Sequence, residues 1–187
     1  MTDWRSLLTS IRAAERPFSP QARLAVIGLT VVACVSLATV QVLRPTPRLV
    51  WNASASAPVG LYWVEPVDRL ELGDLVLAWL PDDARVLAAE RSYLPLNTPG
   101  VKRVAALAGD IVCVRNGFVL VNEGLAARAS DKDSKGRELT PWWGCRALLP
   151  GEVLLLNDDS AASFDGRYFG PSHAHDIVGK LVPVWTD

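Results

Sequence analysis

The sequence predicts a mainly β domain that follows one membrane-spanning helix near the N-terminus. Three observations support this fold class: a long apolar segment without charges, a series of short apolar runs beyond it, and a turn motif that joins two of those runs. The chain has 187 residues, of which 50% are apolar. This length leaves room for a single folded domain after the helix.

The apolar segment runs from Leu24 to Leu43 and carries no charged residue. A helix rises about 1.5 Å per residue, so this segment matches a hydrocarbon core of about 30 Å. A cleaved signal peptide is the alternative, with Ser36 and Ala38 as its small residues. Signal peptides have shorter apolar regions, of about 7 to 15 residues. We therefore predict a transmembrane helix over residues 24–43.

Basic residues dominate the segment before this helix. Two acidic residues stand there against four arginines, namely Arg5, Arg12, Arg16 and Arg23. Positively charged flanks of a membrane span stay in the cytoplasm. The sequence thus predicts a cytoplasmic segment over residues 1–23 and an extracytoplasmic working domain over residues 44–187.

The charges of the whole chain nearly cancel, with 19 basic and 20 acidic residues. Proteins that bind nucleic acids carry an excess of basic residues, at least on one face. We therefore expect no nucleic-acid partner. The cysteines lack the spacing of a zinc site, so we expect no metal and no cofactor.

The three cysteines fall into two environments. Cys34 lies in the predicted span and should be free. Cys113 and Cys145 are the only pair in the outer domain, where the compartment is oxidising. We predict that they form a disulfide, which closes a loop around the polar segment 130–140, a predicted surface loop.

Short runs rich in Val, Leu and aromatic residues make up much of the outer domain and have the length of strands. These runs cover residues 49–51, 60–64, 74–80, 110–114, 118–121, 152–156 and 177–185. Between two of them stands Arg115-Asn116-Gly117, and Asn and Gly tolerate the positive φ of a type I′ turn. Residues 110–121 are therefore predicted to form a hairpin.

One helix is expected over residues 82–93. Asp82 would cap its first turn. The spacing of Val86, Leu87, Glu90 and Tyr93 indicates that these residues face the body of the domain.

A candidate nucleophile follows the first predicted strand. Ser56 lies between small residues, close to Pro58 and Gly60, and this arrangement could expose its hydroxyl. The same composition is typical of a linker after a membrane span. Residues 52–54 also match the N-glycosylation pattern, which occurs often by chance and carries no weight here.

A serine nucleophile needs a base, and the chain offers two histidines and four lysines. His173 and His175 lie in a polar segment that indicates an exposed loop, with at most a weak metal-binding pair. Lys132 and Lys135 lie in the charged loop, where a hydrated ammonium keeps its high pKa.

The other two lysines lie in apolar surroundings. Lys102 leads a strand whose neighbours are apolar, and loss of water around its amine would lower the amine's pKa. Lys180 is the rival, and composition alone does not exclude it.

Four motifs beyond the span occur in the order of a known family. They are Ser56-x-Pro58-x-Gly60-Leu61-Tyr62, Leu72-Gly73-Asp74-Leu75-Val76, Val101-Lys102-Arg103-Val104 with Gly109-Asp110, and Ser163-Phe164-Asp165-Gly166-Arg167-Tyr168-Phe169-Gly170-Pro171. Together they resemble the boxes of the type I signal peptidases, peptidase family S26.

Three features resemble the TraF branch of that family, the conjugative-transfer peptidases that mature pilin precursors. They are the Gly-Leu-Tyr after the serine, the Gly-Cys-Arg at residues 144–146, and the long run that begins at Ser163. Pro58 stands two residues after the serine and no Met follows it, as in the TraF branch.

The resemblance implies an all-β catalytic domain with a Ser-Lys dyad. Ser56 would attack the scissile carbonyl, and a neutral Lys102 would accept its proton. The amide of Ser56 and the hydroxyl of Ser54 would hold the developing oxyanion.

The last motif would support the base. Ser163 would orient the amine of Lys102 through a hydrogen bond. Asp165 and Arg167 would form a supporting pair that holds their loop.

By the same resemblance, we expect a serine endopeptidase anchored in a bacterial inner membrane, with its catalytic domain in the periplasm. Its partner would be a precursor with a leader peptide, cleaved after small residues and pilin-like, from a conjugative or type IV secretion system. A general type I signal peptidase, or a non-catalytic β domain that scaffolds a secretion complex, are the alternatives. Trp51, Tyr62 and Trp63 would face the membrane interface or pack in the core.

Overall fold

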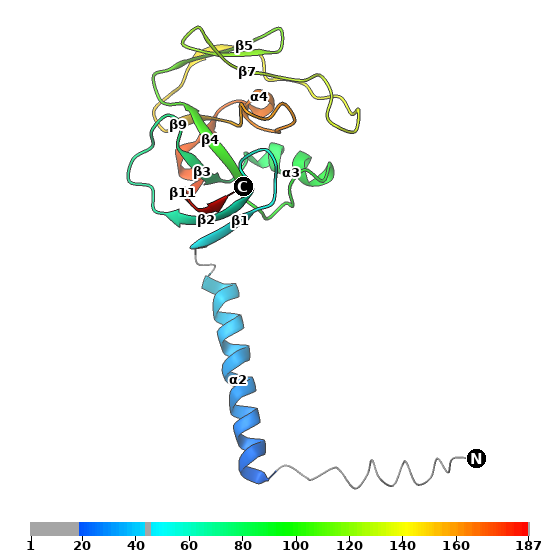
Figure 1. Cartoon of the computed structure of the whole chain (residues 1–187), viewed down its shortest axis with the longest axis vertical. Helices are drawn as coiled ribbons and strands as arrows, with labels where there is room; N and C mark the ends of the chain where they lie inside the picture. The colour runs from blue at the N-terminus through cyan, green and yellow to red at the C-terminus, as the bar shows by residue number, and fades with distance from the viewer. Residues whose placement is uncertain (1–18, 44–45, 187) are drawn as a thin grey trace, which may run out of the picture. The chain divides into compact units, whose positions relative to one another are not determined.

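Two antiparallel sheets, of seven and four strands, form most of the chain beyond Pro47 (Figure 1). They are seen in a computed structural model that describes residues 19–43 and 46–186. The mainly β fold predicted from the sequence is confirmed. Residues from Pro47 onward form one compact unit, separate from the N-terminal helix.

Helix α2 spans Pro20–Leu43 and contains the predicted segment 24–43. The hydroxyls of Thr30, Ser36 and Thr39 donate to carbonyls four residues earlier, so these three groups are satisfied within the helix. The helix is long and apolar enough to cross a membrane. A membrane anchor and a signal sequence both meet this criterion. The predicted segment 1–23 falls largely outside the described residues.

The large sheet has the order β1-β2-β11-β3-β4-β9-β10, and every neighbouring pair is antiparallel. Its strands are β1 (Leu49–Asn52), β2 (Gly60–Glu65), β3 (Leu75–Ala78), β4 (Gly100–Ala106), β9 (Glu152–Leu156), β10 (Ser172–His173) and β11 (Ile177–Thr186). The C-terminal strand thus inserts between two strands from the start of the domain. A 3-10 turn, η1 (Ala174–Asp176), leads into it.

Gly60 permits the close packing of β11 on β2. A Cβ at this position would lie 2.1 Å from the carbonyl oxygen of Trp185. Any side chain there would push the two strands apart. The glycine of the first motif is therefore required by the sheet itself.

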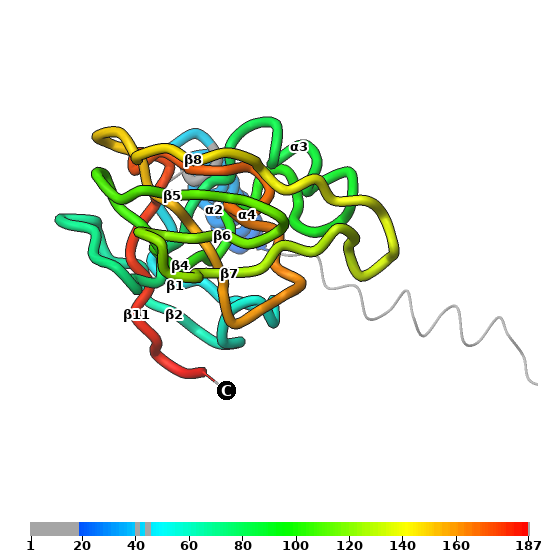
Figure 2. Tube along the Cα trace, turned by 90° about the horizontal axis from the view of Figure 1, so that it is seen from above, coloured from blue at the N-terminus to red at the C-terminus, as the bar shows by residue number. Residues whose placement is uncertain are grey.

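The small sheet has the order β7-β6-β5-β8, and Figure 2 looks onto these four strands side by side. Its strands are β5 (Ile111–Arg115), β6 (Phe118–Val121), β7 (Gly124–Arg128) and β8 (Gly144–Ala147). Arg115 pairs with Phe118 across a two-residue turn, and Asn116 and Gly117 both have positive φ. The predicted hairpin is therefore confirmed.

Strand β9 joins the two halves of the core. Leu154 and Leu156 pack in one cluster with strands of the small sheet, such as Val112 on β5. Val153 and Leu155 pack on the opposite face of β9, against Val76 and Val104 of the large sheet. A strand that is buried on both faces has a continuous apolar sequence, as Val153–Leu156 has.

Helix α3 (Asp82–Glu90) lies within the range predicted, 82–93, but differs in its cap and in its buried face. Pro81 is the N-cap and Asp82 does not cap the helix. Ala84 and Ala88 are buried, whereas Val86 and Glu90 are exposed. Small side chains let the helix approach the aromatic residues beneath it, which the apolar spacing did not reveal.

Three strands were not predicted, namely β7, β8 and β10. Their sequences are short and lack a run of β-branched residues, so each depends on pairing with a stronger neighbour. The predicted run 74–80 is also shortened at both ends, to Leu75–Ala78.

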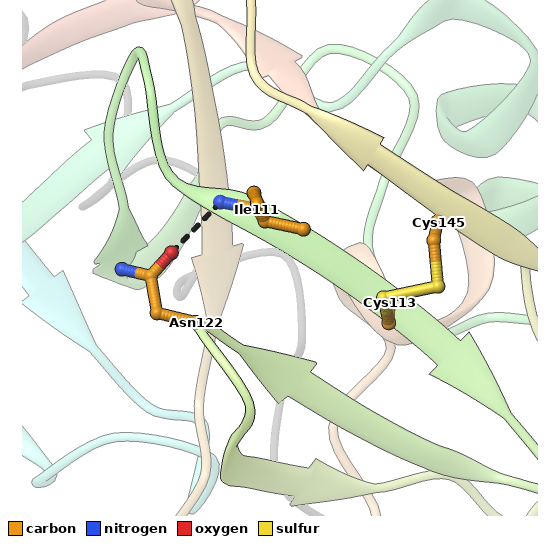
Figure 3. The surroundings of a disulfide bond; sticks show 4 residues. All are labelled: Ile111, Cys113, Asn122 and Cys145. Carbon is orange, nitrogen blue, oxygen red and sulfur yellow. Dashed lines mark hydrogen bonds between the residues drawn. A yellow bond between two sulfur atoms is a disulfide. The ribbon is translucent and has the colours of Figure 1, made fainter.

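Cys113 on β5 stands directly opposite Cys145 on β8, and a disulfide joins them (Figure 3). The closed loop contains the polar segment 130–140. Much of this segment is exposed, but the Asp133 carboxylate is buried and accepts hydrogen bonds from Tyr93 and Arg137. The loop is therefore anchored to the neighbourhood of α3.

We expect the Cys113→Ser/Cys145→Ser double variant to lose about 3 to 4 kcal/mol of unfolding free energy, because the disulfide closes a loop of 32 residues. Chemical denaturation of the full-length chain in detergent measures this loss. Cys34→Ser, outside the β unit, is the control and should leave the outer unit unchanged. Alkylation of both outer thiols without a reductant would contradict the disulfide.

Candidate active site

Ser56 lies in the turn that joins β1 to β2. This turn, residues 53–59, is called the nucleophile turn below. The side chain of Ser56 is partly exposed, and its hydroxyl lies 2.9 Å from that of Ser54. The amide of Ser56 donates to the same Ser54 hydroxyl, at 3.3 Å. The two serines of the predicted site are therefore in direct contact.

Lys102 lies on β4, on the face of the strand that is turned into the protein. Burial alternates along β4, and Lys102 falls in register with the buried residues Gly100 and Val104. Only 7% of Lys102 is exposed. Its amine donates to the hydroxyl of Ser163, at 3.2 Å, across 61 residues of sequence.

Burial lowers the pKa of the Lys102 amine to about 8, because an ammonium loses its hydration there. The negative charge of Asp165 acts in the opposite direction and raises this pKa. The positive charge of Arg167 lowers it. A substantial fraction of Lys102 is therefore neutral at mildly alkaline pH, as a general base requires.

One cavity of about 410 Å³ contains all four candidate groups. Ser54, Ser56, Lys102 and Ser163 line it, together with apolar side chains from α3 and the segments around it. Within the described part of the β unit, no hydrogen bond links Ser56 to Lys102. Lys102 is hydrogen-bonded to Ser163, and Ser56 to Ser54.

Asp165 and Arg167 form a fully buried ion pair at the start of α4 (Gly166–Phe169). The guanidinium contacts both carboxylate oxygens, at 2.8 and 2.7 Å. It also donates to the carbonyls of Arg128, Asn157 and Ser160. This pair therefore connects β7, the end of β9 and the segment that carries Ser163.

The structure separates Lys102 from its rival Lys180. The ammonium of Lys180 lies 2.7 Å from a carboxylate oxygen of Asp74, and this hydrogen bond raises its pKa. Lys180 is thus held in the protonated form and does not line the cavity. Its protonation makes it unsuitable as a general base.

The two histidines lie outside this cavity. Their rings stack with centroids 5.0 Å apart, and both residues are exposed. His173 lies on β10, beside β9, and His175 lies in η1. No cluster of three or more potential metal-ligating side chains occurs among residues 19–43 and 46–186.

Asn52 is the site residue that sequence reasoning missed. It is buried at the end of β1, and its side chain bonds to four backbone groups of the nucleophile turn. An Asn just before a turn of small residues is a signal for such local bonding. The match of residues 52–54 to the N-glycosylation pattern gave no indication of this structural role of Asn52.

The aromatic residues around the nucleophile turn divide between core and surface. Tyr62 is buried and its hydroxyl donates to the carbonyl of Pro58, at 2.7 Å. Trp51 and Trp63 are exposed, and Trp51 stacks on Trp185 with ring centroids 5.8 Å apart. The core interpretation therefore holds for Tyr62 alone.

Comparison with known proteins places this chain in a family. Residues 21–186 match the family described as signal peptidase, peptidase S26. The chain is 38% identical over 148 residues to a plasmid transfer protein TraF of Escherichia coli, which covers 72% of this chain and 81% of that one. A conjugal transfer protein TraF of Agrobacterium fabrum is 34% identical over 144 residues, with the same two coverages.

A crystal structure of a signal peptidase I from Enterococcus faecalis aligns with 62% of this chain and 99% of its own, at 20% identity and a TM-score of 0.37. The family match spans nearly the whole described chain, and both TraF relatives exceed 30% identity over most of their own length. This chain therefore belongs to the signal peptidase family, peptidase S26, in its TraF-like branch.

Proposed function

We propose that this protein is a serine endopeptidase in which Ser56 is the nucleophile and Lys102 the general base. The observation that carries the proposal is the shared cavity. An exposed serine hydroxyl and a buried, weakly hydrated amine line the same space, and Ser163 holds the amine. No histidine lines this cavity.

In the reaction, Ser56 Oγ bonds to the scissile carbonyl carbon and its proton passes to the neutral Nζ of Lys102. The tetrahedral intermediate then collapses, the C–N bond breaks, and Lys102 returns the proton to the leaving amine. Water, deprotonated by Lys102, then attacks the acyl carbon. The ester C–O bond breaks, and Lys102 returns the proton to Ser56 Oγ. The Ser56 hydroxyl must first turn from Ser54 towards Lys102, since catalytic hydrogen bonds are often completed only when substrate binds.

The hydroxyl of Ser54 and the amide of Ser56 would stabilise the oxyanion. In the free enzyme this amide donates to Ser54 Oγ. The oxyanion would replace that acceptor, and Ser54 would turn its own proton towards the charge. Each such donor contributes about 10² to 10³ in rate.

The substrate we propose is a pilin-like precursor with a leader peptide. That it belongs to a conjugative transfer system is supported by the names of the relatives, a plasmid transfer protein and a conjugal transfer protein. Cleavage would follow small residues. We further propose that α2 anchors the protein in a bacterial inner membrane, with residues 1–23 in the cytoplasm and residues 44–187 as a periplasmic catalytic domain.

We expect Ser56→Ala to lower kcat by at least about 10⁴-fold, because the attacking oxygen is gone. The folded fraction should be unchanged, since a partly exposed hydroxyl adds little stability. Ser54→Ala should lower kcat by about 10² to 10³. Cleavage of a synthetic peptide with an Ala-x-Ala site, by full-length enzyme in detergent, measures both.

Ser134→Ala, in the exposed polar loop, is the matched control and should keep wild-type activity. If Ser56→Ala cleaves the peptide at the wild-type rate, Ser56 is not the nucleophile. The scaffold alternative is favoured if the wild-type protein itself shows no cleavage.

Lys102→Arg should be as inactive as Lys102→Met, since a guanidinium keeps its proton and cannot act as a base. In the wild type, kcat/KM should rise with pH through an apparent pKa of about 8, as Lys102 loses its proton. A pH–rate profile from pH 6 to 10 measures this. Lys180→Met is the control, and rescue by Lys102→Arg would refute the dyad.

Lys102→Met should also stabilise the protein at neutral pH, by about 3 kcal/mol. The folded-state pKa of Lys102 lies below its unfolded value, so the buried ammonium destabilises the fold below pH 8. Above that pH the unfolded chain binds more protons, and this penalty shrinks until about pH 10.5. Denaturant unfolding of both proteins at pH 7 and pH 10 measures the difference, and an equal gain at both pH values would contradict it.

A further inference from the structure

Asn52 is the last residue of β1 and immediately precedes the nucleophile turn. It pairs with Gly60 of β2, and Gly60 is itself pressed against the backbone of Trp185 on β11. The backbone of Asn52 is therefore held by the large sheet. Only 5% of the residue is exposed.

The side-chain amide of Asn52 donates hydrogen bonds to three carbonyl groups of the turn. Its nitrogen lies 3.0 Å from the carbonyl oxygen of Ser54, 3.1 Å from that of Ala57 and 3.0 Å from that of Pro58. Its oxygen accepts the amide proton of Ser54, at 3.1 Å. The nitrogen has two hydrogens for three acceptors, so at least one hydrogen is shared.

This bonding determines which groups of the turn are free to face a substrate. Carbonyl oxygens that pointed into the cavity would repel a developing oxyanion, and Asn52 keeps three of them occupied. In a trans peptide the N–H points opposite to the carbonyl, so the Ala55 amide, which shares its peptide unit with the Ser54 carbonyl, is turned away from Asn52. The Ser56 amide is not bonded to Asn52 and donates to Ser54 Oγ, so it stays available to a developing oxyanion.

We propose that Asn52 is the positioning residue of the nucleophile: it transmits the rigidity of the large sheet to the turn and so fixes the direction in which Ser56 attacks. The inference rests on the proposed role of Ser56 as nucleophile. Asn52 makes no covalent contribution and acts only through the backbone around Ser56. None of Asp, Ala and Gln reproduces these bonds: an ionised Asp only accepts, Ala has no polar group, and the side chain of Gln is longer.

The test is Asn52→Asp, which keeps the size of the side chain and replaces its donors with an acceptor. We expect kcat for the Ala-x-Ala peptide to fall about 10²-fold, the usual consequence of misplacing a reacting group by about 1 Å. KM should change by less than about threefold. In Asn52→Ala, which adds no charge to the cavity, the pH midpoint should stay at the wild-type value, because Lys102 is untouched. The rate of labelling of Ser56 by a fluorophosphonate should fall in parallel.

Asn122→Asp is the matched control. Asn122 lies in the turn between β6 and β7 of the small sheet. Its side chain accepts from the amide of Ile111 (Figure 3) and donates to Asp110. This variant should keep wild-type kcat. Endpoint labelling of each variant counts the folded sites, so that kcat is expressed per competent serine.

Two results would overturn the inference. One is a kcat per labelled site in Asn52→Asp that equals the wild-type value, even if fewer sites are labelled. Asn52 would then contribute only to the stability of the fold. The other is an equal loss of kcat in Asn122→Asp. Asn52→Ala repeats the measurement without an added charge. If instead Ser56→Ala remains active, the proposed function itself fails, and this outcome is distinct from both.

Discussion

The buried ion pair between Asp165 and Arg167 is the interaction on which the part of the fold around the candidate site depends. Removing two charges from water is costly unless every donor and acceptor finds a partner. Here the guanidinium satisfies its donors on Asp165 and on carbonyls that follow β7 and β9. Loss of one partner would leave an uncompensated buried charge, at a cost of about 3 to 5 kcal/mol. The two sheets are therefore joined at the segment that carries Ser163.

The same pair explains how Lys102 can lie near a carboxylate and still have a lowered pKa. Asp165 alone would hold the proton on Lys102, because an adjacent negative charge favours the ammonium. Arg167 opposes that effect, and burial then decides the direction of the pKa shift. The ion pair is thus both a structural clamp and an electrostatic screen for the proposed base.

Sheet order brings the proposed catalytic groups together. The nucleophile turn follows an edge strand, β1, whereas Lys102 lies on β4 in the middle of the sheet and Ser163 precedes α4. The insertion of β11 between β2 and β3 completes the sheet that links them, and Gly60 allows that insertion without a steric clash. A rigid strand therefore supplies Lys102, while the turn around Ser56 needs local support, which its hydrogen bonds to Asn52 and Tyr62 provide.

The sequence by itself determined the apolar helix, the strands with continuous or alternating apolar residues, and the hairpin at Asn116-Gly117, because these depend on neighbours within a few residues. The motifs also identified Ser56, Lys102 and Ser163 as candidates. Composition alone left Lys102 and Lys180 open, and the motifs favoured Lys102. The tertiary structure supplies the physical reason, since burial beside Ser163 and pairing with Asp74 both involve residues far apart in the chain. The tertiary structure also decided three further features: the buried alanine face of α3, the short strands that need a partner, and the hydrogen bonds made by Asn52. Desolvation and hydrogen bonding depend on what the fold packs around each side chain.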